Sequence, residues 1–284
     1  DVPCKDYEVG NPADNGKSDS LSAQIDAFSL RSTGHRSIAY HTFMNSASLH
    51  CVPSLNRWLA ICLLLLWGHD SWAAEQEQSV NPGINDNFLE AGLEVGQWVE
   101  RFEREGREVY DQRMAVLEAI DLKTGEAIAD VGAGTGLYTG LFSDKVGPQG
   151  KVMAVDIVPL FLSRIMDRAK ETGRKNIQTV LGSGQSTRLP AASVDKVFIC
   201  DTYHHFEYPK SMLASIYQAL KPDGEIILID FKREEGTSSE WILSHVRAGQ
   251  EVFSAEILAA GFEEVTALPI LKDNYVVRFR KKSS

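Results

Sequence analysis

The chain contains 284 residues, and its 29 basic and 39 acidic side chains give a formal net charge of −10. The composition is that of an ordinary globular protein, and the length allows one large domain or two small ones. The acidic balance argues against nucleic acid as the main partner, because a protein that binds the phosphate backbone presents a basic face.

The first part of the chain differs in character from the rest. Residues 1–43 are polar, show no hydrophobic periodicity and begin with Asp, whereas Met44 is a plausible start. We therefore expect residues 1–43 to be unstructured or to come from upstream translation.

Residues 44–73 have the layout of a secretory signal peptide. Arg57 precedes the uninterrupted apolar run Trp58–Trp67, and Ser71-Trp72-Ala73 places small residues before a cleavage site. The run is well short of the ~20 residues that span a bilayer as a helix, so no stable membrane span is expected after cleavage. The pattern predicts export, in a bacterium to the periplasm. The alternative is a buried helix in a cytoplasmic enzyme.

Cleavage after Ala73 would leave a single cysteine, Cys200, so an internal disulfide is not expected. Cys200 ends an apolar run and is predicted to be a small buried hydrophobe. The remaining histidines and Cys200 do not have the spacing of a structural zinc site.

The rest of the chain is predicted to form a linker over residues 74–92 and one domain over 93–284. Apolar residues recur at helical spacing over 93–120 and indicate one or two amphipathic helices. Short apolar strands are expected at 127–131, 151–157, 177–181, 196–200, 225–231, 262–268 and 274–280. Helices are expected between them at 137–145, 159–173, 211–220, 239–247 and 252–260.

This alternation predicts an α/β fold with a Rossmann-like, doubly wound sheet of about seven strands. Parallel strands that are buried on both faces read as short apolar runs, and helices then cover both faces of the sheet. The connection between the last two strands is too short for a crossover helix, so the final strand is expected to run antiparallel.

The stretch "DVGAGTGLYTG", residues 130–140, follows the first predicted strand and indicates a ligand site. Gly132, Gly134 and Gly136 form G-x-G-x-G, whereas the dinucleotide fingerprint is G-x-G-x-x-G and would need a glycine in place of Leu137. The G-K-[ST] of a phosphate-binding P-loop is absent as well. A Rossmann-type NAD-dependent oxidoreductase therefore remains the alternative rather than the preferred interpretation.

Two carboxylates specify the ligand further. Asp130 ends the first strand beside the turn, where it would repel a pyrophosphate but attract an ammonium or a sulfonium. The backbone N–H groups at the start of the following helix suit the carboxylate of the same ligand. Asp156 ends the second strand, where an acidic side chain can accept hydrogen bonds from both ribose hydroxyls.

Four segments now resemble class I S-adenosylmethionine-dependent methyltransferases, in order and at the family's spacing: "ADVGAGTG", "VMAVDI", "LPAASVDKVFICDTYHHF" and "ALKPDGEIILIDF". The branch that they resemble most is that of the ubiquinone and menaquinone biosynthesis methyltransferases. The resemblance implies S-adenosylmethionine as cofactor. The cofactor-binding residues that it implies are Asp130, Gly132, Ala133, Gly134, Gly136, Asp156, Ile157 and Asp201.

Two further cofactor contacts are predicted. Gln185 stands where many members carry an Asp that accepts from the adenine amino group, and its side-chain carbonyl can accept the same bond. Tyr110, with Arg113, lies on the helix before the first strand and is placed to reach the methionine carboxylate. The alternative for that helix is a solvated charged face with i,i+4 ion pairs.

The catalytic candidates follow the fourth strand in "CDTYHHF". Methyl transfer from a sulfonium is an in-line displacement whose rate comes largely from alignment. Asp201 is expected to face the methionine end of the cofactor. His204 or His205 is a candidate general base, with loop packing as the alternative role, above all for His205.

Other sequence features narrow the acceptor. The D-P-P-Y of nucleic-acid amino methylases is absent after the fourth strand. Metal-dependent O-methyltransferases carry Asp-Asn after the fifth strand, whereas here Phe231 follows Asp230, so no metal is expected. Arg233, His245 and Arg247 are candidates to recognise an anionic acceptor. We therefore predict a methyltransferase acting on a small molecule, the other alternative being a binding protein that retains the cofactor pocket without activity.

Overall fold

The protein is described by a computed structural model, which covers residues 76–282. The predictions for residues 1–43 and 44–73, including the signal peptide, lie outside the described residues. Among the described residues, none of the helices combines the length and the apolar character that a membrane crossing requires.

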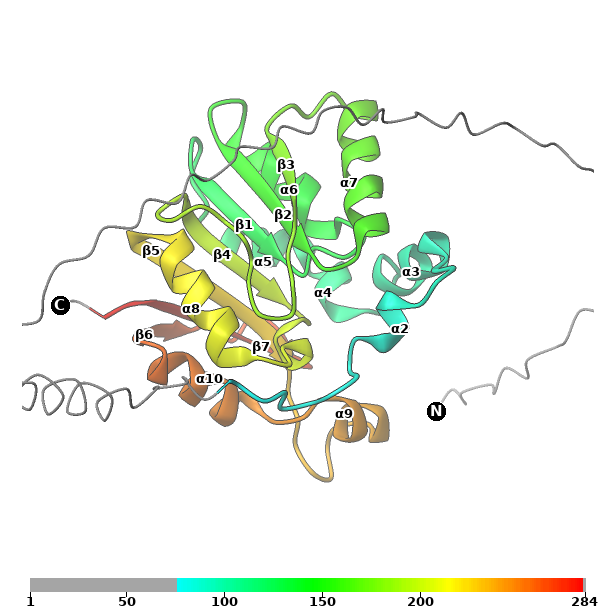
Figure 1. Cartoon of the computed structure of the whole chain (residues 1–284), viewed down its shortest axis with the longest axis vertical. Helices are drawn as coiled ribbons and strands as arrows, with labels where there is room; N and C mark the ends of the chain where they lie inside the picture. The colour runs from blue at the N-terminus through cyan, green and yellow to red at the C-terminus, as the bar shows by residue number, and fades with distance from the viewer. Residues whose placement is uncertain (1–75, 283–284) are drawn as a thin grey trace, which may run out of the picture. The chain divides into compact units, whose positions relative to one another are not determined.

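A seven-stranded sheet forms the centre of the described part of the chain (Figure 1). Its strands are β1 (Ala127–Val131), β2 (Lys151–Asp156), β3 (Ile177–Leu181), β4 (Val194–Cys200), β5 (Leu220–Phe231), β6 (Phe262–Ala267) and β7 (Asn274–Lys281). Their order is β3-β2-β1-β4-β5-β7-β6. β1 to β5 pair in parallel, and β7 runs antiparallel to both β5 and β6. The predicted doubly wound sheet and its antiparallel last strand are confirmed.

Helices cover both faces of this sheet. On one face, α5 (Arg113–Ala119), α6 (Leu137–Val146) and α7 (Pro159–Glu171) contribute apolar side chains to a core with Ile128 of β1. On the other face, α8 (Pro209–Ala219) and α10 (Gln250–Ala259) pack against a second core that contains Ala129. Alternate residues of a strand point to opposite faces, so one short apolar strand supplies both cores.

The segment predicted as a linker, residues 74–92, is instead packed against the domain from residue 76 onward. It contains the short helix α2 (Asp86–Leu89). The Val80 amide donates to the carbonyl of Glu207 at 2.9 Å, and the buried Asn85 donates through Nδ2 to the carbonyl of His205 at 3.0 Å. Polar turn residues suggested a free connection, but here their amides and side chains make long-range hydrogen bonds.

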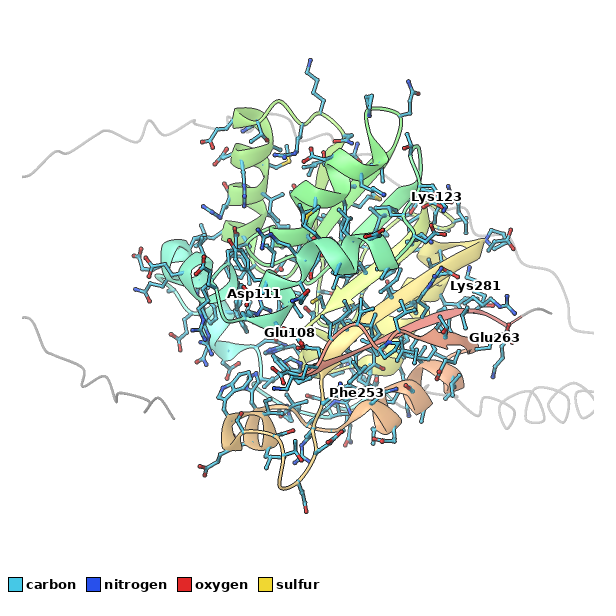
Figure 2. The ribbon with its side chains drawn as sticks, turned by 180° about the vertical axis from the view of Figure 1, so that it is seen from behind. Glu108, Asp111, Lys123, Phe253, Glu263 and Lys281 are labelled. Carbon is cyan, nitrogen blue, oxygen red and sulfur yellow. The ribbon has the colours of Figure 1, made fainter. Side chains whose placement is uncertain are left out.

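Two more helices, α3 (Val95–Phe102) and α4 (Glu108–Asp111), precede α5. Glu108, labelled in Figure 2, holds α4 against the turn before β7, because its carboxylate accepts from the backbone amides of Asp273 (2.8 Å) and Asn274 (2.9 Å). The N-terminal segments are thereby fixed near the carboxyl ends of the parallel strands. The chain reverses its winding between β1 and β4, and ligands of such sheets bind at this switch point.

Candidate active site

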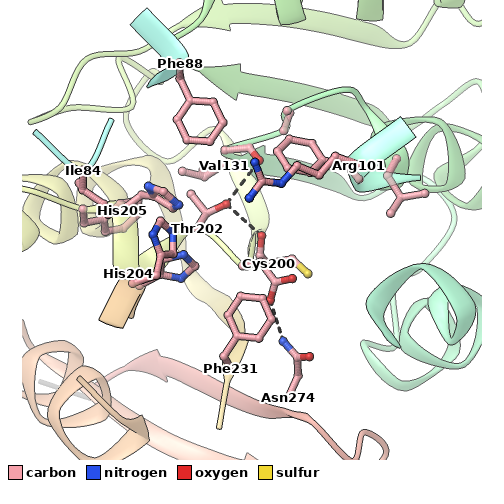
Figure 3. A pocket seen from close by; sticks show the side chains of 18 of the residues that line it. Ile84, Phe88, Arg101, Val131, Cys200, Thr202, His204, His205, Phe231 and Asn274 are labelled. Atoms are coloured by element: carbon pink, nitrogen blue, oxygen red, sulfur yellow. Dashed lines mark hydrogen bonds between the residues drawn. The ribbon is translucent and has the colours of Figure 1, made fainter. Parts of the chain in front are cut away.

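A cavity of about 1110 Å³ lies at the carboxyl ends of β1, β2, β4 and β5. Side chains from α2, α3 and α9 (Glu240–His245) form part of its wall. The residues predicted from the sequence that line it are Asp130, Gly132, Ala133, Gly134, Asp156, Ile157, Asp201, His204 and His205. Figure 3 shows the part of the wall where His204, His205, Thr202 and Phe231 meet.

The turn after β1 has a backbone that only glycine fits well. Gly132 has a φ of +73°, and a Cβ built there would lie 2.2 Å from Cγ2 of Thr202. Gly134 has a φ of +52°, and its Cβ would lie 3.4 Å from the Phe102 ring, on the cavity side. Both positions have a left-handed conformation, and at Gly132 a side chain would also clash with Thr202. Gly136, the N-cap of α6, is not in the cavity wall: a Cβ there would lie 2.8 Å from Ile165, so this glycine serves helix packing.

The polar groups around the turn fit the carboxylate and ribose of S-adenosylmethionine. The Thr135 hydroxyl is buried in the cavity wall and has no hydrogen-bond partner among the described residues, and the N-terminus of α6 follows it. The Asp156 carboxylate accepts from the amides of Gly134 (2.8 Å) and Val158 (2.9 Å), one on each oxygen. Each oxygen keeps a lone pair for a ribose hydroxyl. Burial raises the pKa of Asp156 to about 6.

Asp130 is 4% exposed, and its hydrogen-bond partner among the described side chains is Thr139, whose hydroxyl donates at 2.6 Å. Burial raises the pKa of Asp130 to about 7, because desolvation disfavours the charged form. A ligand cation beside this carboxylate would therefore replace a proton.

Asp201 is buried just after β4 and has a φ of +48°, which is strained for a side chain other than glycine. Its two oxygens accept from Arg107 Nη2 (2.7 Å) and Asn274 Nδ2 (2.6 Å; Figure 3). The pKa of Asp201 is raised, with burial as the main cause and the Arg107 guanidinium acting against it.

Cys200, predicted to be buried, is half-buried in the cavity wall, and burial raises the pKa of its thiol.

Arg107 and Asn274 are functional-site residues that the sequence analysis missed. Arg107 lies in the same charged segment as Tyr110, and its Nη1 also donates to the carbonyl of Phe102 at 2.8 Å. Asn274 is buried and comes from the start of β7, far along the chain. A polar residue directly before the apolar stretch Tyr275–Val277 was the available signal for Asn274.

The structure does not place Tyr110 or Gln185 in the cavity wall, and their cofactor contacts stay predictions. The Tyr110 ring packs under the Arg113 guanidinium, with Cζ 4.3 Å from the ring centre, and Arg113 donates to the Tyr110 carbonyl. Gln185 is exposed in a tight turn. Its neighbours Gly184 and Ser186 line the cavity instead.

Two histidines after β4 occupy the wall opposite the glycine turn. His204 is buried, and its Nδ1 lies 2.8 Å from Oδ1 of Asp230, the buried carboxylate in β5. Burial, with His204 and His245 nearby, lowers the pKa of His205 to about 2, so this ring is neutral.

Of the three residues predicted to recognise an anionic acceptor, the structure places one in the cavity wall and two outside it. His245 of α9 lines the cavity. Arg233 is engaged by the carbonyls of Val246 (2.8 Å) and Leu243 (2.9 Å), and Arg247 pairs with Glu256. The two arginines therefore hold the loop around α9, and the structure does not place them in the cavity wall.

Residues 129–228 match a family model described as a methyltransferase domain. This match identifies residues 129–228 as similar to a methyltransferase domain, and the sheet order and the glycine turn are those of class I S-adenosylmethionine-dependent methyltransferases, enzymes whose cofactor is S-adenosylmethionine.

Particular relatives are distant. The chain is 30% identical over 121 residues to a protein-L-isoaspartate O-methyltransferase of Ignicoccus hospitalis, covering 43% of this chain and 54% of that protein. It is 29% identical over 118 residues to a ubiquinone/menaquinone biosynthesis C-methyltransferase of Pseudomonas savastanoi, covering 41% of this chain and 46% of that one. A SAM-dependent methyltransferase from Aquifex aeolicus has the same fold, with a TM-score of 0.59 at 24% identity over 66% of this chain and 98% of its own. The chain thus spans about half the length of these two curated relatives.

Proposed function

We propose that the protein transfers the methyl group of S-adenosylmethionine to a small-molecule acceptor. The observation that carries this proposal is the continuity of the cavity. One wall holds the glycine turn with Asp130 and Asp156, and the same cavity extends to His204, Phe231 and Trp241. Donor and acceptor can therefore lie in one chamber, as an in-line displacement requires.

The residues of the glycine turn would hold the cofactor, which supplies an electrophilic methyl group when it is bound. Thr135 and the first amides of α6 suit its carboxylate, and Asp130 suits its ammonium. Asp156 suits the ribose hydroxyls, while its bonds to Gly134 and Val158 keep the carboxylate in place. Arg107 and Asn274 orient Asp201 beside this end of the cavity.

The acceptor end of the cavity is aromatic and is covered by the chain itself. Phe231 and Trp241 lie there with ring centres 5.6 Å apart. The covering N-terminal segment is fixed at Glu77, whose carboxylate accepts from the amides of Lys210 (2.8 Å) and Ser211 (2.7 Å). A chamber built this way favours a flat, partly apolar small molecule over a residue within a folded protein.

His204 would serve an acceptor that must lose a proton. Its Nδ1 is held by Asp230, which leaves Nε2 as the available lone pair. The bond to Asp230 also fixes the ring, so the proton acceptor is positioned before the substrate arrives. His205, with a pKa of about 2, is a poor general base. Its neutral ring still has a nitrogen lone pair.

Calorimetry with S-adenosylmethionine and S-adenosylhomocysteine tests the cofactor site. Turnover is then measured with a panel of small aromatic hydroxyl, thiol and amine acceptors, and separately with an isoaspartyl peptide. The proposal expects cofactor binding and methylation of at least one small acceptor. Methylation confined to the isoaspartyl peptide would overturn the small-molecule assignment, and binding of NADH without S-adenosylmethionine binding would favour an oxidoreductase.

A further inference from the structure

Three histidines converge at the acceptor end of the cavity although they come from separate parts of the fold. His204 and His205 belong to the short helix η1 (Tyr203–His205) after β4, and His245 ends α9. One ring nitrogen of each lies within 4.8 Å of one ring nitrogen of both others. Figure 3 shows His204 and His205 next to each other at the wall of the cavity.

The spacing of the rings matches a common metal ion. Their centres lie 4.3 Å (His204–His205), 5.3 Å (His204–His245) and 5.1 Å (His205–His245) apart. Three imidazoles bound to one tetrahedral ion through bonds of about 2.0 Å have ring centres roughly 5 Å apart. Small side-chain rotations would bring the three nitrogens to bonding distance.

The tautomer that a metal site requires of His204 is already set by a neighbouring carboxylate. A metal-binding histidine usually gives its other ring nitrogen to a carboxylate or a backbone carbonyl. Asp230 takes Nδ1 of His204, which leaves Nε2 for an ion. The backbone of Ile84 lies beside the ring of His205, whose buried Nδ1 has no partner among the described residues. An unpartnered buried nitrogen carries a desolvation cost that a bound ion would remove.

The charge of the surroundings is compatible with a cation. The imidazoles of His205 and His245 would bind an ion as neutral rings, since a histidine ligates a metal through a deprotonated nitrogen. The buried Asp230 contributes a negative charge behind His204. The opposing group is Arg101, which acts on both His205 and His245 but is itself exposed to solvent.

We propose that His204, His205 and His245 form a site for one divalent transition-metal ion such as Zn²⁺, with its fourth position open to the cavity. Three protein ligands and an open position are typical of catalytic rather than structural zinc. This donor set is distinct from the Asp and Asn ligands whose absence led the sequence analysis to expect no metal. Imidazole ligands select Zn²⁺, Fe²⁺, Ni²⁺ or Cu²⁺ over Mg²⁺.

The role of the ion rests on the proposed function. An acceptor hydroxyl or thiol bound at the open position would have a lowered pKa and would lose its proton to solvent before attack. His204 would then act as a ligand, and the ion would replace it as the group that generates the nucleophile. Such an acceptor would be held against the aromatic wall formed by Phe231 and Trp241.

The test titrates Zn²⁺ into chelator-treated full-length protein against a chromophoric chelator, and records the visible spectrum with Co²⁺. We expect one site with a tetrahedral Co²⁺ spectrum. Its affinity should fall at least roughly a hundredfold in His245→Gln and in His205→Gln, and tenfold to a hundredfold in Asp230→Asn. The matched control is Ser244→Ala, an exposed neighbour of His245, which should bind Zn²⁺ as the wild type does.

Circular dichroism and S-adenosylhomocysteine calorimetry on each variant show whether the fold and the cofactor site are intact. Because His245 is only half-buried, His245→Gln is the decisive variant if the other variants fail to fold. Absence of Zn²⁺ binding, or equal binding by wild type and His245→Gln, overturns the metal site even if methyl transfer is found. Metal binding with unchanged turnover after chelation overturns the role in acceptor activation, whereas loss of cofactor binding in the wild type counts against the proposed function itself.

Discussion

The pKa of Asp130 leads to a pH dependence of cofactor binding whose direction is fixed. The carboxylate is 4% exposed, is bonded to Thr139, and has a pKa of about 7 in the ligand-free protein. The ammonium of a bound amino-acid ligand stabilises the ionised form of Asp130. Binding must then release a proton below pH 7, and affinity must rise as the pH rises.

The expected size follows from that pKa. If the ligand binds only the ionised carboxylate, affinity at pH 6 is roughly tenfold below its value at pH 8, equivalent to about 1.4 kcal/mol. Asp156, with a pKa of about 6, protonates next, so the dependence steepens below pH 6. Calorimetry with S-adenosylhomocysteine in buffers of different ionisation enthalpy measures both the affinity and the number of protons released. In Asp130→Asn the dependence between pH 6 and pH 8 should shrink to roughly twofold, which is what the half-protonation of Asp156 at pH 6 leaves.

The same pKa shift has a consequence for the stability of the ligand-free protein. The pKa of Asp130 rises from an ordinary 3.8 to about 7 on folding, so the folded state binds the proton more tightly. Stability is therefore highest below pH 4 for this group and is lost as the pH rises from about 4 to about 7, by up to about 4 kcal/mol. Asp130→Asn should lack this loss. The reasoning would be refuted by an S-adenosylhomocysteine affinity that does not change from pH 6 to pH 8. It would also be refuted if this affinity depended on pH as strongly in Asp130→Asn as in the wild type.

Three further predictions concern the same site. Gly134→Val should abolish cofactor binding with an unchanged circular dichroism spectrum, because its side chain would enter the cavity from a left-handed backbone position; Gly140→Ala, within α6, is the control, and binding within tenfold of wild type would contradict the prediction. Asp156→Ala should weaken cofactor binding by about 1–3 kcal/mol in calorimetry, and an unchanged dissociation constant would remove Asp156 from the site. Arg107→Gln should destabilise the protein by about 2 kcal/mol in chemical denaturation, less than a fully buried pair because Arg107 is 22% exposed, and adding Asp201→Asn should recover part of that loss.

The strands were predictable because each short apolar run is bounded by polar or turn-forming residues. The range predicted for the first strand, 127–131, is the one the structure shows, since Gly125 precedes it and Gly132 follows it. Ends without such signals shifted: the predicted strand at 225–231 begins earlier, at Leu220, because the chain is already extended there and Leu220 pairs with Val194. Strands at the centre of such a sheet can be predicted from the sequence, because burial on both faces makes each of them a continuous apolar run.

The part of the site that lies directly on the strand ends was predictable for the same reason. Asp130 and Asp156 lie at the carboxyl ends of β1 and β2, and Asp201 follows β4. Parallel strands bring their carboxyl ends to one edge of the sheet. The cover was not predictable, because it depends on long-range contacts. The pairing of Arg107 with Asp201 joins residues far apart in the chain, and nothing local distinguishes Arg107 from Arg113.

The three carboxylates Asp130, Asp201 and Asp230 show how the site is prepared for a cationic ligand. Each lies at or just after the end of a central strand, where burial penalises a charge, and each has a different compensation. Arg107 compensates Asp201, and His204 bonds to Asp230. Among the described residues, the hydrogen-bond partner of the Asp130 side chain is a hydroxyl, so a proton compensates Asp130. The glycine turn after β1 forms part of the cavity wall, so the carboxylate that lacks a protein cation is the one beside that turn. A ligand that carries its own positive charge completes that balance, whereas a pyrophosphate would add to the buried negative charge.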